Sequence, residues 1–134
     1  MFDFNEIMDV KQALNVNPIV LAFVGDAVYT LYVRKKLTIQ TDFKAGEMQK
    51  LSTSEVNANA QALFVKEIMD ILTEEELGVF KRARNAKKGT KAKHASVVDY
   101  NMATGFEAVL GFLYLTGQNE RLNLILNKGE KHES

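Results

Sequence analysis

Two carboxylates stand out because each lies within an otherwise apolar, helix-forming stretch of the chain. Asp26 is near the middle of residues 18–33, and Glu107 is near the middle of residues 97–115. An unpaired carboxylate among apolar residues is costly, so a cation, a hydrogen-bond network or a water-filled cleft must compensate for it. From the first stretch alone, a core aspartate with satisfied hydrogen bonds, or one at a solvent-facing edge, fits the pattern equally well.

Small or weakly polar residues surround both carboxylates at helical spacing. If the two helices pack antiparallel with these residues facing, the carboxylates converge, and two close carboxylates need a shared proton or a bound cation. Oxygen ligands without His or Cys favour Mg²⁺, with Mn²⁺ as a substitute, over zinc. The alternative is that the two carboxylates never meet. The small neighbours are Ala22, Gly25 and Thr30 in the first stretch and Ala103, Thr104 and Gly111 in the second.

A run of basic residues without any acidic residue is the third feature. Because residues 84–95 lack apolar periodicity, we expect 81–95 to form a basic, mobile loop. Such a run suits phosphate contacts, which position a nucleic acid without reading its sequence, although an ordinary solvated loop has the same composition. A metal-binding acid pair near such a loop suggests phosphodiester chemistry. The candidate nucleic-acid-binding residues are Lys81, Arg82, Arg84, Lys87, Lys88, Lys91 and Lys93.

Residues 18–33 are expected to form the central helix that positions Asp26. Asn17 is a typical N-cap, and Pro18 suits the first helical position, where its missing N–H costs nothing. Because apolar or small residues occupy nearly every face, we expect this helix to be buried all round.

The remaining elements are also expected to be helices. No strand signal, internal repeat or domain boundary is present, so we predict an all-α fold in a single domain spanning residues 1–134. The patterns predict a brief helix within 3–14, a connection at 37–41, one long helix over about 43–68, helices at 73–83 and 97–115, a short helix from Asn119, and a frayed tail at 128–134.

Composition excludes several other classes of protein. The 134 residues are 46% hydrophobic and 25% charged, which is typical of a soluble domain with a real core. The absence of cysteine rules out a disulfide scaffold or a thiolate zinc site. With two histidines in the chain, a Ser-His-Asp catalytic triad has little support. Neither a signal pattern nor a membrane-length apolar run is present, so we expect a cytoplasmic protein with no membrane contact.

The two segments that carry the carboxylates resemble motifs of the ribonuclease III family. The family's signature segment is similar to residues 23–28 (FVGDAV), and its second acidic motif is similar to residues 103–115 (ATGFEAVLGFLYL). Together with residues 84–87 (RNAK) and the basic segment after them, they resemble the small bacterial subgroup, Mini-ribonuclease III. In that subgroup we expect no separate double-stranded-RNA-binding domain beyond Ser134.

The resemblance implies a ribonuclease III-like helical endonuclease domain in a two-fold homodimer. Its implied activity is cleavage of double-stranded RNA with a divalent metal, leaving 5′-phosphate products, and its implied role is maturation of the ends of 23S ribosomal RNA precursor, with a ribosomal protein as a candidate helper. By motif match, Asp26 and Glu107 are the metal-binding catalytic acids. Phe23 matches the aromatic residue that the family inserts into its dimer partner.

Two positions depart from the acidic pattern of full-length ribonuclease III. Ala22 stands where the family has a Glu, and Thr104 stands where it has an Asp. Half of the acidic cluster is therefore missing, and water together with Thr104, acting as an outer ligand, could fill part of the gap. Two alternatives remain open: a catalytically inactive relative that binds duplex RNA, and a helical interaction module.

Overall fold

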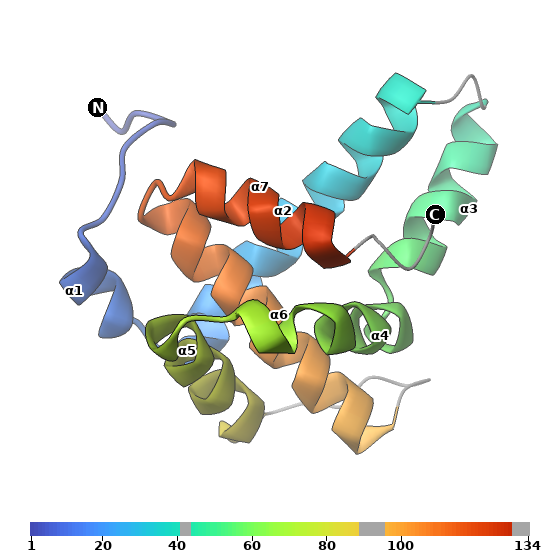
Figure 1. The fold of residues 1–134 in the computed structure, drawn as a ribbon. Helices are drawn as coiled ribbons and strands as arrows, with labels where there is room; N and C mark the ends of the chain where they lie inside the picture. The colour runs from blue at the N-terminus through green and yellow to red at the C-terminus, as the bar shows by residue number, and fades with distance from the viewer. Residues whose placement is uncertain (41–43, 89–95, 130–134) are drawn as a thin grey trace.

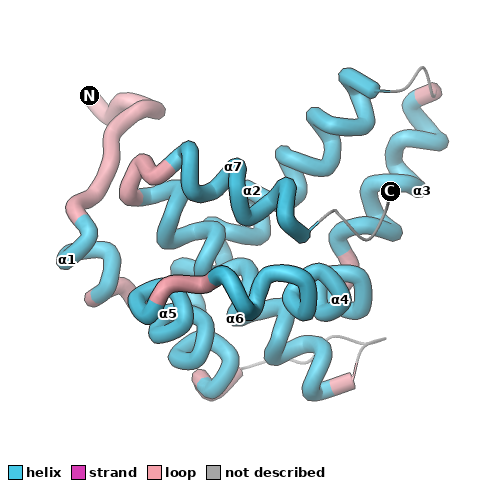
Figure 2. The backbone as a smooth tube through the Cα atoms, viewed as in Figure 1, coloured by secondary structure: helices cyan, strands magenta, loops and turns pink. Residues whose placement is uncertain are grey.

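The computed structural model describes residues 1–40, 44–88 and 96–129, and within them the fold is all-α (Figure 1, Figure 2). No strand occurs in these ranges, so the predicted fold class is confirmed. Among the described residues, no helix combines the length and the apolar character that crossing a bilayer requires. The elements in chain order are α1 (Val10–Leu14), α2 (Pro18–Gln40), α3 (Ala45–Val56), α4 (Ala58–Ile68), the 3₁₀ turn η1 (Met69–Ile71), α5 (Glu74–Asn85), α6 (Val97–Leu115) and α7 (Asn119–Gly129).

Helix α6 is the centre of the fold, and α2, α4, α5 and α7 all pack against it (Figure 1). From Ala103 to Leu113 every residue of α6 is buried except Glu107, which is half-buried. The ring of Phe106 lies 5.2 Å from that of Tyr29 on α2 and 5.0 Å from that of Phe64 on α4, measured between centroids. This aromatic cluster joins three helices and fixes their relative positions in the core.

Two glycines allow α2 and α6 to cross at backbone contact. A Cβ atom built on Gly25 would lie 1.6 Å from the carbonyl oxygen of Glu107, and one built on Gly111 would lie 2.0 Å from that of Leu21. Both distances are far below a van der Waals contact, so a larger residue at either position would force the helices apart. Because Gly25 precedes Asp26 directly, the same contact brings Asp26 beside Glu107.

Helix α2 is longer than the sequence predicts. It continues to Gln40, so the connection expected at 37–41 is wrong over its described part. The physical reason is that Val33 and Leu37 keep helical spacing and are both buried. Each turn of helix added toward the end of α2 therefore still makes contact with the core.

One face of α2 is exposed, so the expectation that this helix is buried all round is wrong for a single chain. Val20, Phe23 and Leu31 are exposed, with Phe23 at 78% of its full accessible surface. These residues follow each other at spacings of three and eight, which places them along one side of the helix. The opposite side, including Leu21 and Tyr29, is in the core.

The helix predicted over 43–68 is two helices instead. It breaks at Asn57, whose backbone is extended, with φ at −72° and ψ at 161°. The side chain of Asn57 accepts a hydrogen bond of 2.9 Å from the N–H of Ala60 and so caps α4. Asparagine competes in this way with the continuing helix, and the break gives α4 its own direction toward α6.

The predicted helix ends agree with the structure at three places. Thr73 and Glu76 form a reciprocal capping box at the start of α5, and Ser96 accepts from the N–H of Asp99 at the start of α6. Gly117 follows α6 with φ at 71°, a conformation that glycine adopts without strain.

Three predicted boundaries shift. Helix α1 covers only the end of 3–14, and α5 continues to Asn85, so residues 81–85 of the expected loop are helical. Helix α7 continues to Gly129, two residues into the expected tail. The rest of that tail, residues 130–134, lies outside the described residues.

We predict that Gly111→Ala lowers the free energy of unfolding by roughly 1–3 kcal/mol or more, because the added methyl group overpacks the crossing of α2 and α6. The matched control is Gly78→Ala on α5, where a Cβ atom meets nothing within 4 Å. That control should become more stable by about 0.5–1 kcal/mol from helix propensity alone. Urea denaturation measures both, and equal stability of the two variants would contradict the crossing described above.

Candidate active site

The side chains of Asp26 and Glu107 meet where α2 crosses α6. Asp26 is exposed and Glu107 is half-buried, and their carboxyl groups lie within interaction range of each other. The amide of Gln61, which comes from α4, donates from Nε2 to Oε2 of Glu107 over 3.3 Å. Three helices that are distant in sequence thus each contribute one polar side chain to the same place.

Burial raises the pKa of Glu107 to about 9, and the hydrogen bond and negative charge of Asp26 add to this effect. The hydrogen bond from Gln61 acts in the opposite direction and lowers the pKa. In the metal-free protein at neutral pH, Glu107 therefore keeps its proton. A divalent cation would take the place of that proton.

The acid pair fits a hard cation such as Mg²⁺. This ion prefers oxygen ligands, keeps several waters and is commonly held in proteins by one or two carboxylates. No group of three or more His, Cys, Asp or Glu side chains that could hold a metal occurs in the part of the chain that the structure describes. The described part of the chain therefore offers two carboxylates at this place, and water and substrate would complete the coordination.

The two positions that depart from the family's acidic pattern are both buried. Ala22 is on α2, one turn before Asp26. Thr104 is on α6, and its hydroxyl donates to the carbonyl oxygen of Tyr100 over 2.8 Å. The hydroxyl proton is thus used within the helix, and a role for Thr104 toward the metal stays a prediction.

Gln61 is not among the site residues predicted from the sequence. The sequence does carry a signal for it. The helical pattern places this long polar side chain on the same side of the helix as Ala58, Ala62 and Val65, where a core residue is expected. In the structure its side chain is only 1% exposed.

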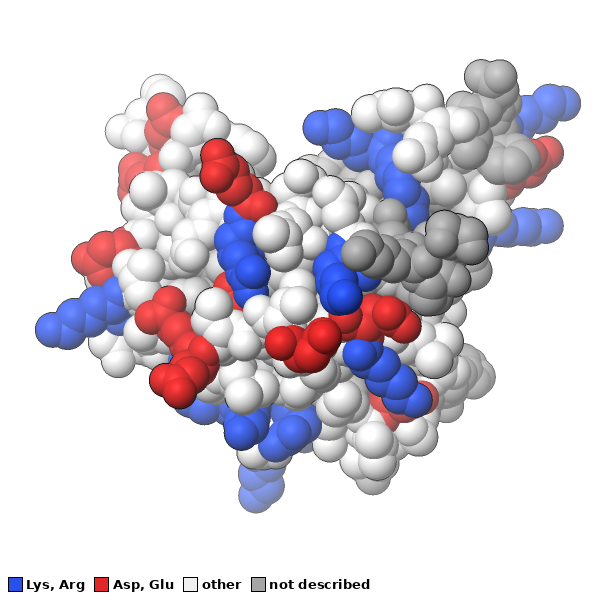
Figure 3. Space-filling model, viewed as in Figure 1, with Lys and Arg blue, Asp and Glu red and all other residues white. Residues whose placement is uncertain are grey.

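The predicted RNA-binding residues lie mainly at and after the end of α5. Blue side chains gather there at the lower edge of the molecule in Figure 3. Helix α5 packs against α6 at Gly105, where the Phe80 ring fills the space of a side chain, two residues before Glu107. Lys81, Arg82 and Arg84 lie on α5, Lys87 and Lys88 follow it, and Lys91 and Lys93 lie outside the described residues.

Some of these basic groups hold the local structure. Arg82 donates from Nη1 to the carbonyl oxygen of Leu14 over 2.9 Å and so ties α5 to α1. Lys88 donates to the carbonyl oxygens of Arg84 and Ala86, both over 2.9 Å, and burial lowers its pKa. Of the five candidate residues that the structure describes, Lys81, Arg82 and Lys87 are exposed, whereas Arg84 and Lys88 are half-buried.

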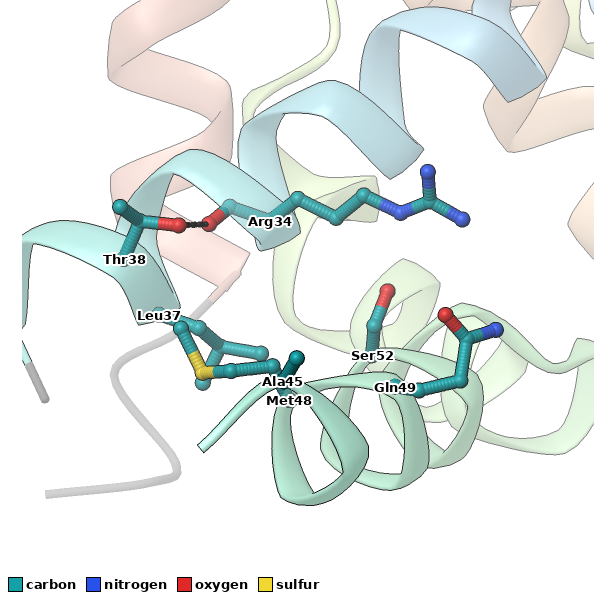
Figure 4. Close-up of a pocket in the computed structure, with 7 residues that line it drawn as sticks. All are labelled: Arg34, Leu37, Thr38, Ala45, Met48, Gln49 and Ser52. Atoms are coloured by element: carbon teal, nitrogen blue, oxygen red, sulfur yellow. Dashed lines mark hydrogen bonds between the residues drawn. The ribbon is translucent and has the colours of Figure 1, made fainter. Parts of the chain in front are cut away.

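A pocket of about 310 Å³ lies away from the acid pair, between the end of α2 and the start of α3 (Figure 4). Leu37, Ala45 and Met48 cluster at one end of it, and the Arg34 side chain extends above Ser52 and Gln49 (Figure 4). Neither Asp26 nor Glu107 lines it. The lining residues are Arg34, Leu37, Thr38, Ala45, Met48, Gln49 and Ser52.

Comparison with known proteins identifies the family. The Ribonuclease III domain model matches residues 19–118. A Mini-ribonuclease 3 from Clostridium tetani is 44% identical over 94% of this chain and 90% of its own length, and one from Thermoanaerobacter sp. is 46% identical over 90% and 85%. A crystal structure of a Fusobacterium nucleatum protein matches with a TM-score of 0.79 and 33% identity, covering 90% of this chain and 96% of that one.

The family model spans both Asp26 and Glu107, and the similarity to the named relatives extends over most of each chain. The resemblance inferred from residues 23–28 and 103–115 is thereby confirmed. The chain belongs to the ribonuclease III family and, within it, to the group whose members are named Mini-ribonuclease 3.

Proposed function

We propose that this protein is a divalent-metal-dependent endoribonuclease that cuts double-stranded RNA. The observation that carries the proposal is the contact between Asp26 and Glu107 at the crossing of α2 and α6. Two carboxylates forced together at a partly exposed place are costly for a purely structural site, whereas a cation-binding site needs them. Membership of the ribonuclease III family supports the same reaction and substrate class.

In this proposal, Asp26 and Glu107 hold Mg²⁺, with Mn²⁺ as a substitute. When bound, the metal lowers the pKa of a water molecule and stabilises negative charge on the scissile phosphate. Glu107 must give up its proton to bind the metal, and Asp26 is exposed and therefore accessible to a substrate. Hydrolysis of this kind leaves 5′-phosphate and 3′-hydroxyl ends.

We propose that the protein works as a homodimer through the exposed apolar face of α2. Val20, Phe23 and Leu31 form that face. A second copy is the occupant that fits, because a two-fold interface pairs the same patch on both subunits. Asp26 shares α2 with this face, so dimerisation would bring two acid pairs to one duplex. Cuts on opposite strands would then leave 3′ overhangs of about two nucleotides, as the family resemblance implies.

The proposed natural substrate follows from the same family resemblance. We propose that the substrate is the precursor of 23S ribosomal RNA, whose ends the enzyme would mature in the cytoplasm. A ribosomal protein is a candidate helper that would present this duplex. Cleavage of a synthetic duplex with the precursor's paired ends, compared with a scrambled duplex of equal length, tests this substrate.

The first prediction from this proposal concerns the acid pair. Asp26→Asn and Glu107→Gln should each lower cleavage of a defined duplex in Mg²⁺ by about 10³-fold or more, because each removes several kcal/mol of charge stabilisation. Glu120→Gln, at an exposed carboxylate on α7, is the control and should keep full activity. End sequencing of the products checks the overhang and the 5′-phosphate. Normal turnover by either variant would remove that residue from the proposed role.

The second prediction concerns pH. Folding prefers neutral Glu107, whose pKa rises from 4.5 to about 9, so the metal-free protein should become less stable as the pH rises between these values. Glu107→Gln removes this effect and should be more stable than wild type by roughly 3 kcal/mol at pH 7. Denaturation in chelator at pH 5, 7 and 8.5 measures the effect, with Glu120→Gln as control. Parallel pH profiles of wild type and Glu107→Gln would disprove it.

The third prediction concerns the basic residues at and after the end of α5. Replacing Lys81 and Lys87 together by Ala should weaken duplex binding and reduce the slope of its salt dependence by about one for each phosphate that is no longer neutralised. Sequence preference should not change, because phosphate contacts position the duplex. The control removes equal charge at Lys66 and Lys128, on α4 and α7. If both double variants bind alike, the basic segment is an ordinary solvated surface.

The fourth prediction concerns association. Phe23→Ala should shift the protein from dimer to monomer at micromolar concentration, because the side chain is 78% exposed in a single chain and would be buried in the dimer. Leu124→Ala, at an exposed apolar residue of α7, should leave association unchanged. Sedimentation velocity separates the two cases. A wild-type monomer at this concentration would rule out the proposed interface.

A further inference from the structure

A buried amide lies beside the acid pair without an obvious structural purpose. Gln61 is 1% exposed and stands on the core side of α4, near Ala62, Phe64 and Val65, which are all buried. An amide in such surroundings costs about 1–3 kcal/mol unless its polar atoms are hydrogen-bonded. An apolar residue would avoid this cost, so the choice of glutamine points to the partner that it contacts.

That partner is Glu107, and packing fixes the helices that carry the two residues. Nε2 of Gln61 donates to Oε2 of Glu107 across 46 residues of sequence. On one side, Asn57 caps α4 and sets where the helix begins. On the other side, Phe64 packs on Phe106, the residue before Glu107, with ring centroids 5.0 Å apart. The donor is therefore placed by packing rather than by a flexible side chain at the surface.

The chemistry of an amide suits a carboxylate that must bind a cation. A lysine or arginine at this position would neutralise Glu107 and compete with the metal, and another carboxylate would add repulsion. An aliphatic residue would remove the hydrogen bond to Oε2 of the half-buried Glu107. Glutamine supplies a hydrogen-bond donor without charge, so it holds one oxygen of Glu107 and leaves the charge of the acid pair available.

We propose that Gln61 is a positioning residue that holds Oε2 of Glu107 and so orients this carboxylate toward Asp26 for a divalent cation. The inference rests on the proposed function, because it assumes that the acid pair binds a metal. Partners that orient a metal ligand typically change metal affinity by about 10- to 100-fold when they are removed.

The test is Mg²⁺ binding to Gln61→Met, measured by calorimetry without RNA. Methionine has a similar length and no N–H donor, so we expect affinity to fall by about tenfold or more in a protein that stays folded. Gln61→Asn, whose amide is one carbon shorter and cannot reach Oε2, should weaken binding to the same extent. The matched control is Gln49→Met at an exposed position of α3, which should bind Mg²⁺ like wild type.

Cleavage provides a second readout that a purely structural role would not move. The activity of Gln61→Met should recover as the Mg²⁺ concentration rises, with the KM for duplex RNA unchanged. Wild-type Mg²⁺ affinity in either folded Gln61 variant would overturn the inference. If wild type itself binds no Mg²⁺ and cuts no duplex RNA, the proposed function fails instead, so the two failures are distinguishable.

Discussion

The close contact between Gly25 and Gly111 is the constraint on which the candidate site depends. At these residues the backbones of α2 and α6 touch, and no side chain separates them. Each helix carries its carboxylate within four residues of its glycine, so the crossing fixes the separation of Asp26 and Glu107. The aromatic cluster of Tyr29, Phe64 and Phe106 then holds α4 against both helices. The polar site is positioned by apolar packing.

This arrangement makes the metal-free state electrostatically unfavourable. Burial and the nearby charge of Asp26 raise the pKa of Glu107, so Glu107 holds a proton at neutral pH. A bound cation would replace that proton and also stabilise the fold, since a ligand that binds the native state adds to its stability. The same charge pattern that lowers stability in the absence of metal is thus the pattern that metal-dependent phosphodiester cleavage requires.

The sequence predicts the fold class and the acid pair because both depend on local patterns. Apolar periodicity with one carboxylate in each of two small-residue stretches is visible without a structure, and so are the helix starts near residues 73 and 97. The helix break at Asn57 cannot be predicted in this way, because the apolar pattern continues on both sides of this one capping residue. Gln61 is also missed, since its meaning depends on a partner 46 residues away. Hydrophobicity alone also misses the exposed face of α2, because it does not distinguish a core from an interface between chains. Only the family resemblance places Phe23 outside the core.

The central claim is that the crossing of α2 and α6 builds a divalent-cation site from Asp26 and Glu107. Anomalous diffraction from crystals soaked in Mn²⁺ tests it most directly, because this ion has the same oxygen preference as Mg²⁺ and a measurable anomalous signal. We predict that the strongest peak lies between the two carboxylates and disappears in Glu107→Gln crystals. A peak at another site, or no peak although both side chains are ordered and ionised, would contradict it.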